Sequence, residues 1–259
     1  MKEKDFVEER RIKLLEYINK NGRADVAQLA EWFDVTVATV RRDLLIMEEQ
    51  NLIYRTHGGA IKRAQPSLWE TTTLQERSIQ HIEDKERIAD LVEQLVHDGD
   101  SIMIDGGSTT LCVAKKLTSK KKMLIVTNTS TIGELFADIN DNKVILTGGE
   151  LAKSTNSTIG VAAEQAIKQY RVDKAIIGVS GLLLEEGFFS AIPSEAEIKR
   201  LMLKNAREKI VVMDSSKVGT PALCFVCDFS GIDKLVTDKS ISKVALDQLR
   251  KAGVEVFTM

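Results

Sequence analysis

Residues 25–44 read DVAQLAEWFDVTVATVRRDL, and this stretch decides the fold of the N-terminal part of the chain. Asp25 precedes a short apolar segment and is a favoured helix N-cap, with Gln28 three residues later as in a capping box. Thr36 stands in the same position before a second segment, after a tight turn at residues 34–35. Two capped helices joined by so short a turn predict a helix-turn-helix over residues 24–43.

The second of these helices has two different faces. Val40 and Leu44 are four residues apart and can anchor the helix to a core. Its polar side chains point elsewhere. In a recognition helix the N-terminal side chains reach base edges, and arginine can donate two hydrogen bonds to guanine. The side chains that we expect to contact DNA from this helix are Thr36, Thr39, Arg41 and Arg42.

A glycine turn follows the helix-turn-helix. Residues 52–63 read LIYRTHGGAIKR. This pattern places a short strand-like segment on either side of a Gly-Gly pair. A hairpin in this place is a wing, and its basic side chains can approach the DNA phosphates. We expect wing contacts from Arg55, His57 and Gly58.

Bulk charge gives no support to DNA binding. The chain carries 36 lysines and arginines against 38 aspartates and glutamates. Residues 1–63 hold twelve basic and eleven acidic side chains, so a basic excess exists only locally. The alternative is a protein-docking module, in which Arg41 and Arg42 pair with Asp43, Glu48 or Glu49.

The character of the sequence changes after residue 63. Residues 64–77 are polar and without periodicity, which predicts a linker. From residue 78 onward, short apolar segments alternate with amphipathic ones, the pattern of a parallel sheet covered by helices. The predicted strands span residues 101–104, 124–127, 144–147, 174–177, 210–213, 234–237 and 254–257. We therefore predict a winged helix-turn-helix domain (1–63), the linker (64–77) and a Rossmann-like, mostly parallel α/β domain that binds an effector (78–259).

Glycine and hydroxyl residues follow the first predicted strand, where residues 105–110 read DGGSTT. Ligands of open parallel sheets bind beyond the carboxyl ends of the strands. Glycines let backbone N–H groups approach an anion, and a helix N-terminus favours negative charge. The loop matches neither a Walker nor a dinucleotide motif, and a tight turn with a serine cap is an equally good interpretation. As a phosphate cradle it would use Asp105, Gly107, Ser108, Thr109 and Thr110.

Four further predicted strands end in polar or glycine-rich tips, at residues 127–130, 147–150, 178–181 and 214–217. The carboxyl ends of parallel strands share one edge of a sheet, so these tips converge. Lys217 suits a phosphate dianion, although a surface position is the usual place of a lysine. The further effector contacts that we expect are Asn128, Gly149 and Lys217.

On these residues the N-terminal part resembles the DeoR family of bacterial sugar-metabolism regulators. The resemblance is carried by TVRRDL at residues 39–44 and RTHGGA at residues 55–60. Thr36 stands where the family usually has serine, and both residues cap helices. The resemblance implies a winged helix-turn-helix in which Thr39, Arg41 and Arg42 contact DNA and the turn at residues 57–59 lies near the backbone.

The C-terminal part resembles the sensor domain of the same family through DGGSTT, VTNT (126–129), LTGG (146–149) and DSSK (214–217). That domain is similar in fold to ribose-5-phosphate isomerases and glucosamine-6-phosphate deaminases, which hold the sugar phosphate with the matching loop and lysine. The resemblance implies a phosphorylated sugar or sugar alcohol as effector. It places Ser108, Thr109, Thr110 and Lys217 at the phosphate. Ser180 departs from the pattern, since many members have aspartate there.

An isomerase fused to a DNA-binding module is the competing hypothesis. Isomerisation needs a general base near the reacting carbons. The isomerases place acidic residues after their fourth strand, whereas residues 178–182 read GVSGL and contain no carboxylate. Glu185 and Glu186 fit a solvated loop. We therefore expect no enzyme activity and no cofactor, and we predict a DNA-binding regulator of a carbohydrate-metabolism operon, most simply a repressor.

The remaining expectations concern location, metals and assembly. The absence of an export signal and of a long apolar run predicts a cytoplasmic protein without membrane contact. Cys224 and Cys227 have metal-ligand spacing, but no second pair or histidine lies nearby, so we expect core packing and no metal. One helix-turn-helix contacts little DNA, which predicts a homo-oligomer, a dimer or tetramer, on double-stranded operator DNA.

Overall fold

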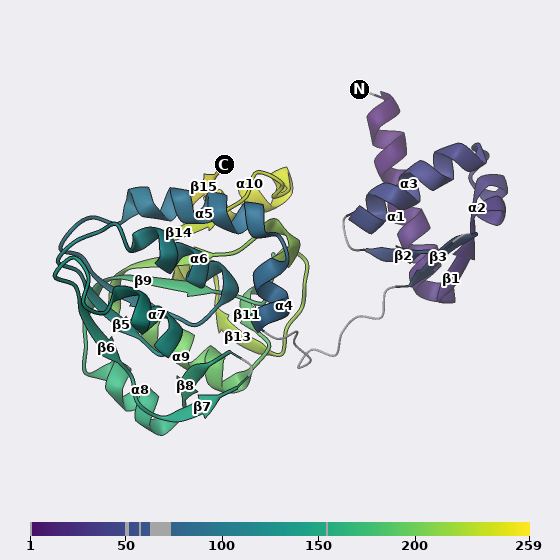
Figure 1. Cartoon of the computed structure of the whole chain (residues 1–259). Coiled ribbons are helices and arrows are strands. Elements are labelled where there is room, and N and C mark those ends of the chain that lie inside the picture. Colours follow the sequence, from purple (N-terminus) through teal and green to yellow (C-terminus); the bar gives the residue numbers. More distant parts are fainter. Residues whose placement is uncertain (1, 50–51, 57, 63–73, 154) are drawn as a thin grey trace. The chain divides into compact units, whose positions relative to one another are not determined.

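The structure is a computed structural model that describes residues 2–49, 52–56, 58–62, 74–153 and 155–259. The chain divides into two compact units, Met1–Pro66 and Ser67–Met259, each described by itself below (Figure 1). The predicted domain boundary at residue 63 and most of the predicted linker lie outside the described residues. The last four residues of the predicted linker, 74–77, are described, and they form the start of helix α4 (Leu74–Ile79). Six residues are too few for a helical periodicity to show in the sequence.

The first unit packs helices against a small antiparallel sheet. Its elements are α1 (Lys2–Asn21), β1 (Arg23–Asp25), α2 (Val26–Trp32), α3 (Val37–Glu49), β2 (Ile53–Arg55) and β3 (Gly59–Lys62). The strand order is β1-β3-β2, so the predicted wing hairpin is confirmed and gains a third strand from the segment before α2. The side chains that form the core are each at most 1 % exposed: Leu14, Ile18, Leu29, Val40, Leu44, Met47 and Ile53.

Capping hydrogen bonds set the ends of the two helix-turn-helix helices. The Asp25 carboxylate accepts from the N–H of Ala27 at 2.8 Å and of Gln28 at 3.4 Å. Thr39 donates its N–H to the Thr36 hydroxyl at 3.1 Å. These three bonds satisfy first-turn N–H groups that have no partner inside the helix. The predicted caps, and with them the helix-turn-helix, are confirmed.

The second unit is a parallel sheet between two layers of helices. Its strands are β4 (Ser101–Ile104), β5 (Leu124–Thr127), β6 (Lys143–Leu146), β9 (Val172–Gly178), β12 (Ala206–Val212), β14 (Lys234–Thr237) and β15 (Glu255–Thr258). They lie in the order β15-β14-β12-β9-β4-β5-β6, and every neighbouring pair is parallel. The predicted strands and the parallel sheet are confirmed, although individual strand ends move by up to four residues.

Helices cover both faces of this sheet (Figure 1). One face carries α5 (Ile82–Leu95), α6 (Ser108–Leu117) and α7 (Ser130–Phe136), and the other carries α8 (Val161–Lys168), α9 (Pro193–Lys204) and α10 (Lys243–Lys251). Each layer buries its own apolar core, which explains why the strands are apolar on both sides. The carboxyl ends of β4, β5, β6, β9 and β12 therefore meet at one edge, where the predicted polar tips lie.

Short antiparallel pieces complete this unit. β7 (Glu150–Ala152) pairs with β8 (Ser157–Ile159), and β11 (Gly187–Ser190) lies between β10 (Gly181–Leu183) and β13 (Cys224–Cys227). These short strands were not predicted from the sequence, because three or four residues carry little periodicity. Within the described ranges, no helix is long and apolar enough to cross a membrane.

Candidate functional site

The two arginines of the predicted recognition helix lie in solvent. Arg41 and Arg42 are both exposed on α3. Their neighbour Asp43 is only 2 % exposed, and it binds Arg10 Nε at 2.7 Å and Arg11 Nε at 2.9 Å, both on α1. No ion pair joins Arg41 or Arg42 to another residue that the structure describes. Asp43, one of the three partners that the docking-module alternative offers, is therefore taken by α1, and the side chain of Glu49, another of them, lies outside the described part of the chain.

The start of α3 is ordered by its two threonines. The Thr36 and Thr39 hydroxyl oxygens lie 2.8 Å apart, and Thr36 also accepts the Thr39 N–H. A hydroxyl has three hydrogen-bonding positions, so each threonine keeps capacity for a further partner. Both predicted DNA contacts thus also position the N-terminal turn of the helix.

The predicted wing residues differ in whether their side chains already have partners. Arg55 donates its N–H to Glu48 at 3.1 Å, and its guanidinium lies 3.5 Å from the same carboxylate. An exposed pair of that length contributes little, so the guanidinium can turn to another anion. The pairing of Glu48 is therefore with Arg55 and not with Arg41 or Arg42. Gly58 is exposed on the turn, and His57 lies outside the described residues.

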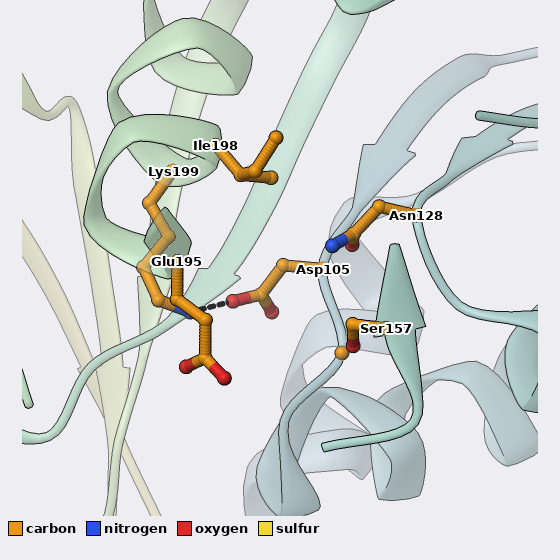
Figure 2. A pocket seen from close by; sticks show the side chains of 7 residues that line it. Asp105, Asn128, Ser157, Glu195, Ile198 and Lys199 are labelled. Carbon is orange, nitrogen blue, oxygen red and sulfur yellow. Dashed lines mark hydrogen bonds and ion pairs between the residues drawn. The ribbon is translucent and has the colours of Figure 1, made fainter. Parts of the chain in front are cut away.

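A pocket opens at the carboxyl edge of the parallel sheet, beside the start of α9 (Figure 2). It encloses about 180 Å³ of empty space, part of it open to solvent. Its lining is Asp105, Gly106, Asn128, Ser157, Glu195, Ile198 and Lys199. Two of the predicted effector residues, Asp105 and Asn128, are thus brought together, while the lining from β8 and α9 was not predicted.

The Asp105 carboxylate forms a buried ion pair with Lys199 of α9. The two residues are 1 % and 6 % exposed, and the Lys199 ammonium contacts Oδ2 directly. The other carboxylate oxygen accepts the Gly178 N–H at 3.1 Å, which ties the end of β4 to the end of β9. A buried charge needs such partners, because leaving either ion unpaired in the interior is costly.

Two acceptor oxygens in the pocket have no partner among the described residues. They are Oε1 of Glu195, a residue 8 % exposed, and Oδ1 of Asn128, a residue 2 % exposed. The amide nitrogen of Asn128 donates to the Thr158 carbonyl at 3.0 Å, which fixes the direction of its free oxygen. Figure 2 shows Glu195 and Asn128 on opposite sides of Asp105. Buried acceptors without donors are rare, and here they point to a ligand that donates hydrogen bonds.

The backbone at Gly106 comes very close to the β7–β8 hairpin. A Cβ atom at this position would lie 2.0 Å from the Ser157 hydroxyl oxygen. A larger residue here would have to displace the Ser157 side chain, which lines the pocket together with Gly106.

The hydroxyl residues of the DGGSTT loop divide into two groups. Thr110 is fully buried, donates its hydroxyl to the Asp105 carbonyl and accepts the Gly107 N–H, both at 2.8 Å. The hydrogen bonds of Thr110 and Gly107 therefore hold the loop in shape. Ser108 and Thr109 are each 8 % exposed, and no hydrogen bond joins their hydroxyls to the described part of the chain.

Gly149 and Lys217, also predicted for the effector, lie outside the pocket lining. Gly149 has φ +130°, and a Cβ there would lie 2.5 Å from the Ile159 carbonyl oxygen, so its glycine serves the local backbone. Lys217 is half-buried and its ammonium has no partner among the described residues. Burial alone would raise the pKa of Asp214, but nearby Lys217 and the Ser216 hydroxyl outweigh it and hold that pKa below its usual value.

The tip at residues 178–182 contains no carboxylate, as the sequence shows, but α9 brings Glu195 to the same edge, and the sequence reasoning missed this residue. A signal was present in the sequence: Glu195 and Lys199 are four residues apart on a helix face that also carries Ala196 and Met202. Charged residues on an apolar face need partners, which marks them as site candidates. Glu185 and Glu186, in contrast, are exposed as predicted.

The three cysteines are half-buried. Cys112, Cys224 and Cys227 are free thiols, and no group of three or more potential metal-binding side chains occurs among the described residues. Burial raises the pKa of the Cys227 thiol to about 12.

Comparison with known proteins matches both units to family models. Residues 10–65 match the DeoR-like helix-turn-helix domain, and residues 80–239 match the DeoR C-terminal sensor domain. The transcriptional repressor GlcR of Bacillus subtilis is 31 % identical over 97 % of this chain and 96 % of its own length. The glycerol-3-phosphate regulon repressor of Escherichia coli is 35 % identical over 87 % of this chain and 88 % of its own.

Solved structures show weaker similarity. A D-ribose-5-phosphate isomerase aligns with a TM-score of 0.40 and 16 % identity, over 53 % of this chain and 54 % of its own. A similarity of that size carries no argument about activity.

Proposed function

The chain belongs to the DeoR family of DNA-binding transcriptional regulators, and from this premise we propose that it represses a carbohydrate-metabolism operon until a phosphorylated sugar or sugar alcohol binds its sensor domain. The free face of α3 carries the DNA half of the proposal. Since Asp43 is satisfied by Arg10 and Arg11, the guanidinium groups of Arg41 and Arg42 remain available for base edges and phosphates.

The unpartnered acceptors Glu195 and Asn128 support the effector half. Sugar hydroxyls are donors that can satisfy both oxygens. A phosphate dianion would meet two carboxylates, Asp105 and Glu195, against one ammonium, so the phosphorylated end belongs outside this pocket. The free hydroxyls of Ser108 and Thr109 are the nearest predicted phosphate contacts, and the first turn of α6 favours an anion.

Turnover is not part of this proposal. Asp105 is held by Lys199 and Gly178, which leaves Glu195 as the only carboxylate of the pocket lining without an ion-pair partner. GlcR and the glycerol-3-phosphate regulon repressor, which match most of this chain, are named repressors, and this supports binding without chemistry. Conversion of ribose 5-phosphate or glucosamine 6-phosphate by the purified protein would contradict this view.

Retardation of promoter DNA tests the DNA-binding half. Each bidentate arginine contact is worth about 1–3 kcal/mol, so Arg41→Ala/Arg42→Ala is expected to weaken binding by at least about 30-fold. Arg207→Ala, which removes an arginine that is 87 % exposed in the second unit, is the matched control and should bind as the wild type does. Equal binding by the double variant and the control would refute the recognition helix.

The effector half is tested on the same complex. A panel of sugar phosphates, with glycerol 3-phosphate included, should contain a compound that releases the DNA and raises the melting temperature of the protein. The unphosphorylated compounds should do neither. We further propose a cytoplasmic dimer or tetramer, because a single helix-turn-helix reads only one half-site.

A further inference from the structure

Glu195 lies in the first turn of α9, and its side chain lines the pocket. The residue is 8 % exposed, and its Oε1 has no hydrogen-bond partner among the described residues. No side chain caps this end of the helix, because Ile192 stands at the N-cap. First-turn N–H groups attract negative charge, so the helix itself favours a carboxylate at this position.

The basic side chains that α9 carries near Glu195 are engaged elsewhere. Lys199, one helical turn further along, forms the buried ion pair with Asp105. Arg200 binds Glu197, with its Nη2 at 2.7 Å from Oε2. Within the described ranges, no salt bridge joins Glu195 to another residue. Its charge is therefore not neutralised by any side chain that the structure describes.

The side chains that line the pocket carry one more negative than positive charge. Asp105 and Glu195 are carboxylates, and Lys199 is the single basic residue of this lining. The excess charge belongs to a residue that is more than nine-tenths buried, where water compensates it poorly. A charge in such surroundings needs a counter-charge in direct contact. The lining is thus one positive charge short of balance.

Asn128 adds a neutral acceptor to the same pocket. Its amide nitrogen donates to the Thr158 carbonyl, which leaves Oδ1 as an acceptor without a partner. Ser157, on the opposite wall from α9, has no free proton, since its hydroxyl donates to the Thr155 carbonyl at 3.2 Å (Figure 2). The pocket therefore fits a ligand end that donates several hydrogen bonds.

Three kinds of ligand group meet these acceptors differently. A sugar hydroxyl donates one hydrogen bond and brings no charge, so it leaves the Glu195 carboxylate unbalanced. A phosphate or carboxylate group would be repelled by Asp105 and Glu195 together. A primary ammonium brings three donors and a positive charge, and its hydrogen bonds to a carboxylate are about twice as strong as neutral ones. Of the three, the ammonium alone satisfies both the charge and the acceptors.

The size of the pocket limits how much of a ligand can enter it. Its empty volume is about 180 Å³, part of which is open to solvent. Sites for drug-sized ligands begin at roughly 300 Å³, so this space suits a single sugar unit. Ile198 gives the lining an apolar side chain against which sugar carbons can pack.

We propose that the effector is an amino sugar phosphate whose ammonium group binds Glu195, while Asn128 accepts a hydrogen bond from the same end of the sugar. This inference rests on the proposed function, because it names the class of phosphorylated sugar that the sensor domain takes. The phosphate stays outside the pocket, since the two carboxylates that attract the ammonium repel it. Glu195 is then the residue that distinguishes an amino sugar from its neutral counterpart.

Binding of matched sugar phosphates to the full-length chain tests this inference. The amino probes are glucosamine 6-phosphate and galactosamine 6-phosphate, and glucose 6-phosphate and galactose 6-phosphate are their counterparts with a hydroxyl in place of the ammonium. One amino probe should raise the melting temperature and release promoter DNA at a concentration at least about 10-fold below that of its counterpart. Its N-acetyl derivative, which lacks the charge, should lose this advantage. Equal binding by amino and hydroxyl compounds overturns the inference.

Glu195→Gln tests whether this residue sets the preference. The amide keeps the size and one acceptor oxygen but removes the charge, so the variant should need about 10- to 100-fold more of the amino probe. The ratio between the amino and hydroxyl compounds should fall to about one. Glu197→Gln is the matched control on the same helix, because Glu197 pairs with Arg200 and lies outside the lining. A preference that persists in Glu195→Gln, with cooperative thermal unfolding to show that the variant is folded, overturns the assignment.

Failure of this inference can be told apart from failure of the proposed function. If a neutral sugar phosphate releases the DNA at least as well as the amino probes do, the inference fails and the proposed function stands. If no sugar phosphate releases the DNA, both fail. Magnesium chloride alone is a further probe. Stabilisation of the wild type by magnesium that is lost in Glu195→Gln would assign the carboxylate to a metal ion and overturn the inference.

Discussion

Breaking the buried pair of Asp105 and Lys199 should destabilise the second unit strongly. Lys199→Met keeps an unbranched apolar side chain but leaves the Asp105 carboxylate, 1 % exposed, with the Gly178 N–H at 3.1 Å. Removing one partner of a buried pair costs about 3–5 kcal/mol. For a domain of this size that loss corresponds to a fall in melting temperature of about 6–20 °C.

The double variant Asp105→Asn/Lys199→Met separates the charge effect from the loss of packing. An amide at position 105 can still accept the Gly178 N–H, and removal of both charges from a buried pair is often nearly neutral. We therefore expect the double variant to recover most of the stability that Lys199→Met loses, with a coupling energy of at least about 2 kcal/mol.

Calorimetry and urea unfolding of the wild type, Lys199→Met, Asp105→Asn and the double variant measure this double-mutant cycle. The argument is refuted if Lys199→Met loses less than about 1 kcal/mol, below the range for a broken buried pair. It is equally refuted if the two single losses simply add in the double variant, because independent sites add.

Four further predictions follow from single side chains. Glu195→Gln should weaken binding of the releasing sugar phosphate by about 10- to 100-fold, since a charged acceptor is lost, while promoter retardation without ligand stays unchanged. Thr36→Ala should lower the stability of the first unit by about 1 kcal/mol in thermal unfolding, whereas Thr36→Ser should be nearly neutral. Cys227, with its pKa raised to about 12, should react with iodoacetamide at pH 8 far more slowly in the folded than in the urea-unfolded protein. The pKa of Asp214 is lower in the folded protein than its unfolded value of 3.8. Its carboxylate therefore contributes its full stabilisation above pH 3.8, and this stabilisation is lost as the pH falls through the folded-state pKa. Asp214→Asn should flatten the curve of stability against pH in this acid range.

The helix-turn-helix could be predicted because its signals are local. Asp25 and Thr36 cap helices through bonds to residues at most three positions away, and Val40 and Leu44 mark a buried face by spacing alone. The parallel sheet was equally accessible, since strands covered on both faces must be apolar throughout. The convergence of the strand tips then follows from the chain direction in a parallel sheet.

Partners far apart in the chain could not be predicted. Asp105 and Lys199 are separated by 94 positions, and Asp43 meets Arg10 and Arg11 across 33 and 32. Periodicity tells which face of a helix is buried but not which element covers it. For that reason the sequence left the pairing of Arg41 and Arg42 open.

By itself, then, the sequence determined two kinds of unit and the edge of the sheet where the pocket lies. Only the tertiary structure decided that Glu195 and Lys199 complete that pocket and that the Thr110 hydroxyl serves the loop. The physical reason is that capping and periodicity act over a few residues. Burial and charge balance depend on which distant segments pack together, and a pattern along the chain does not record that.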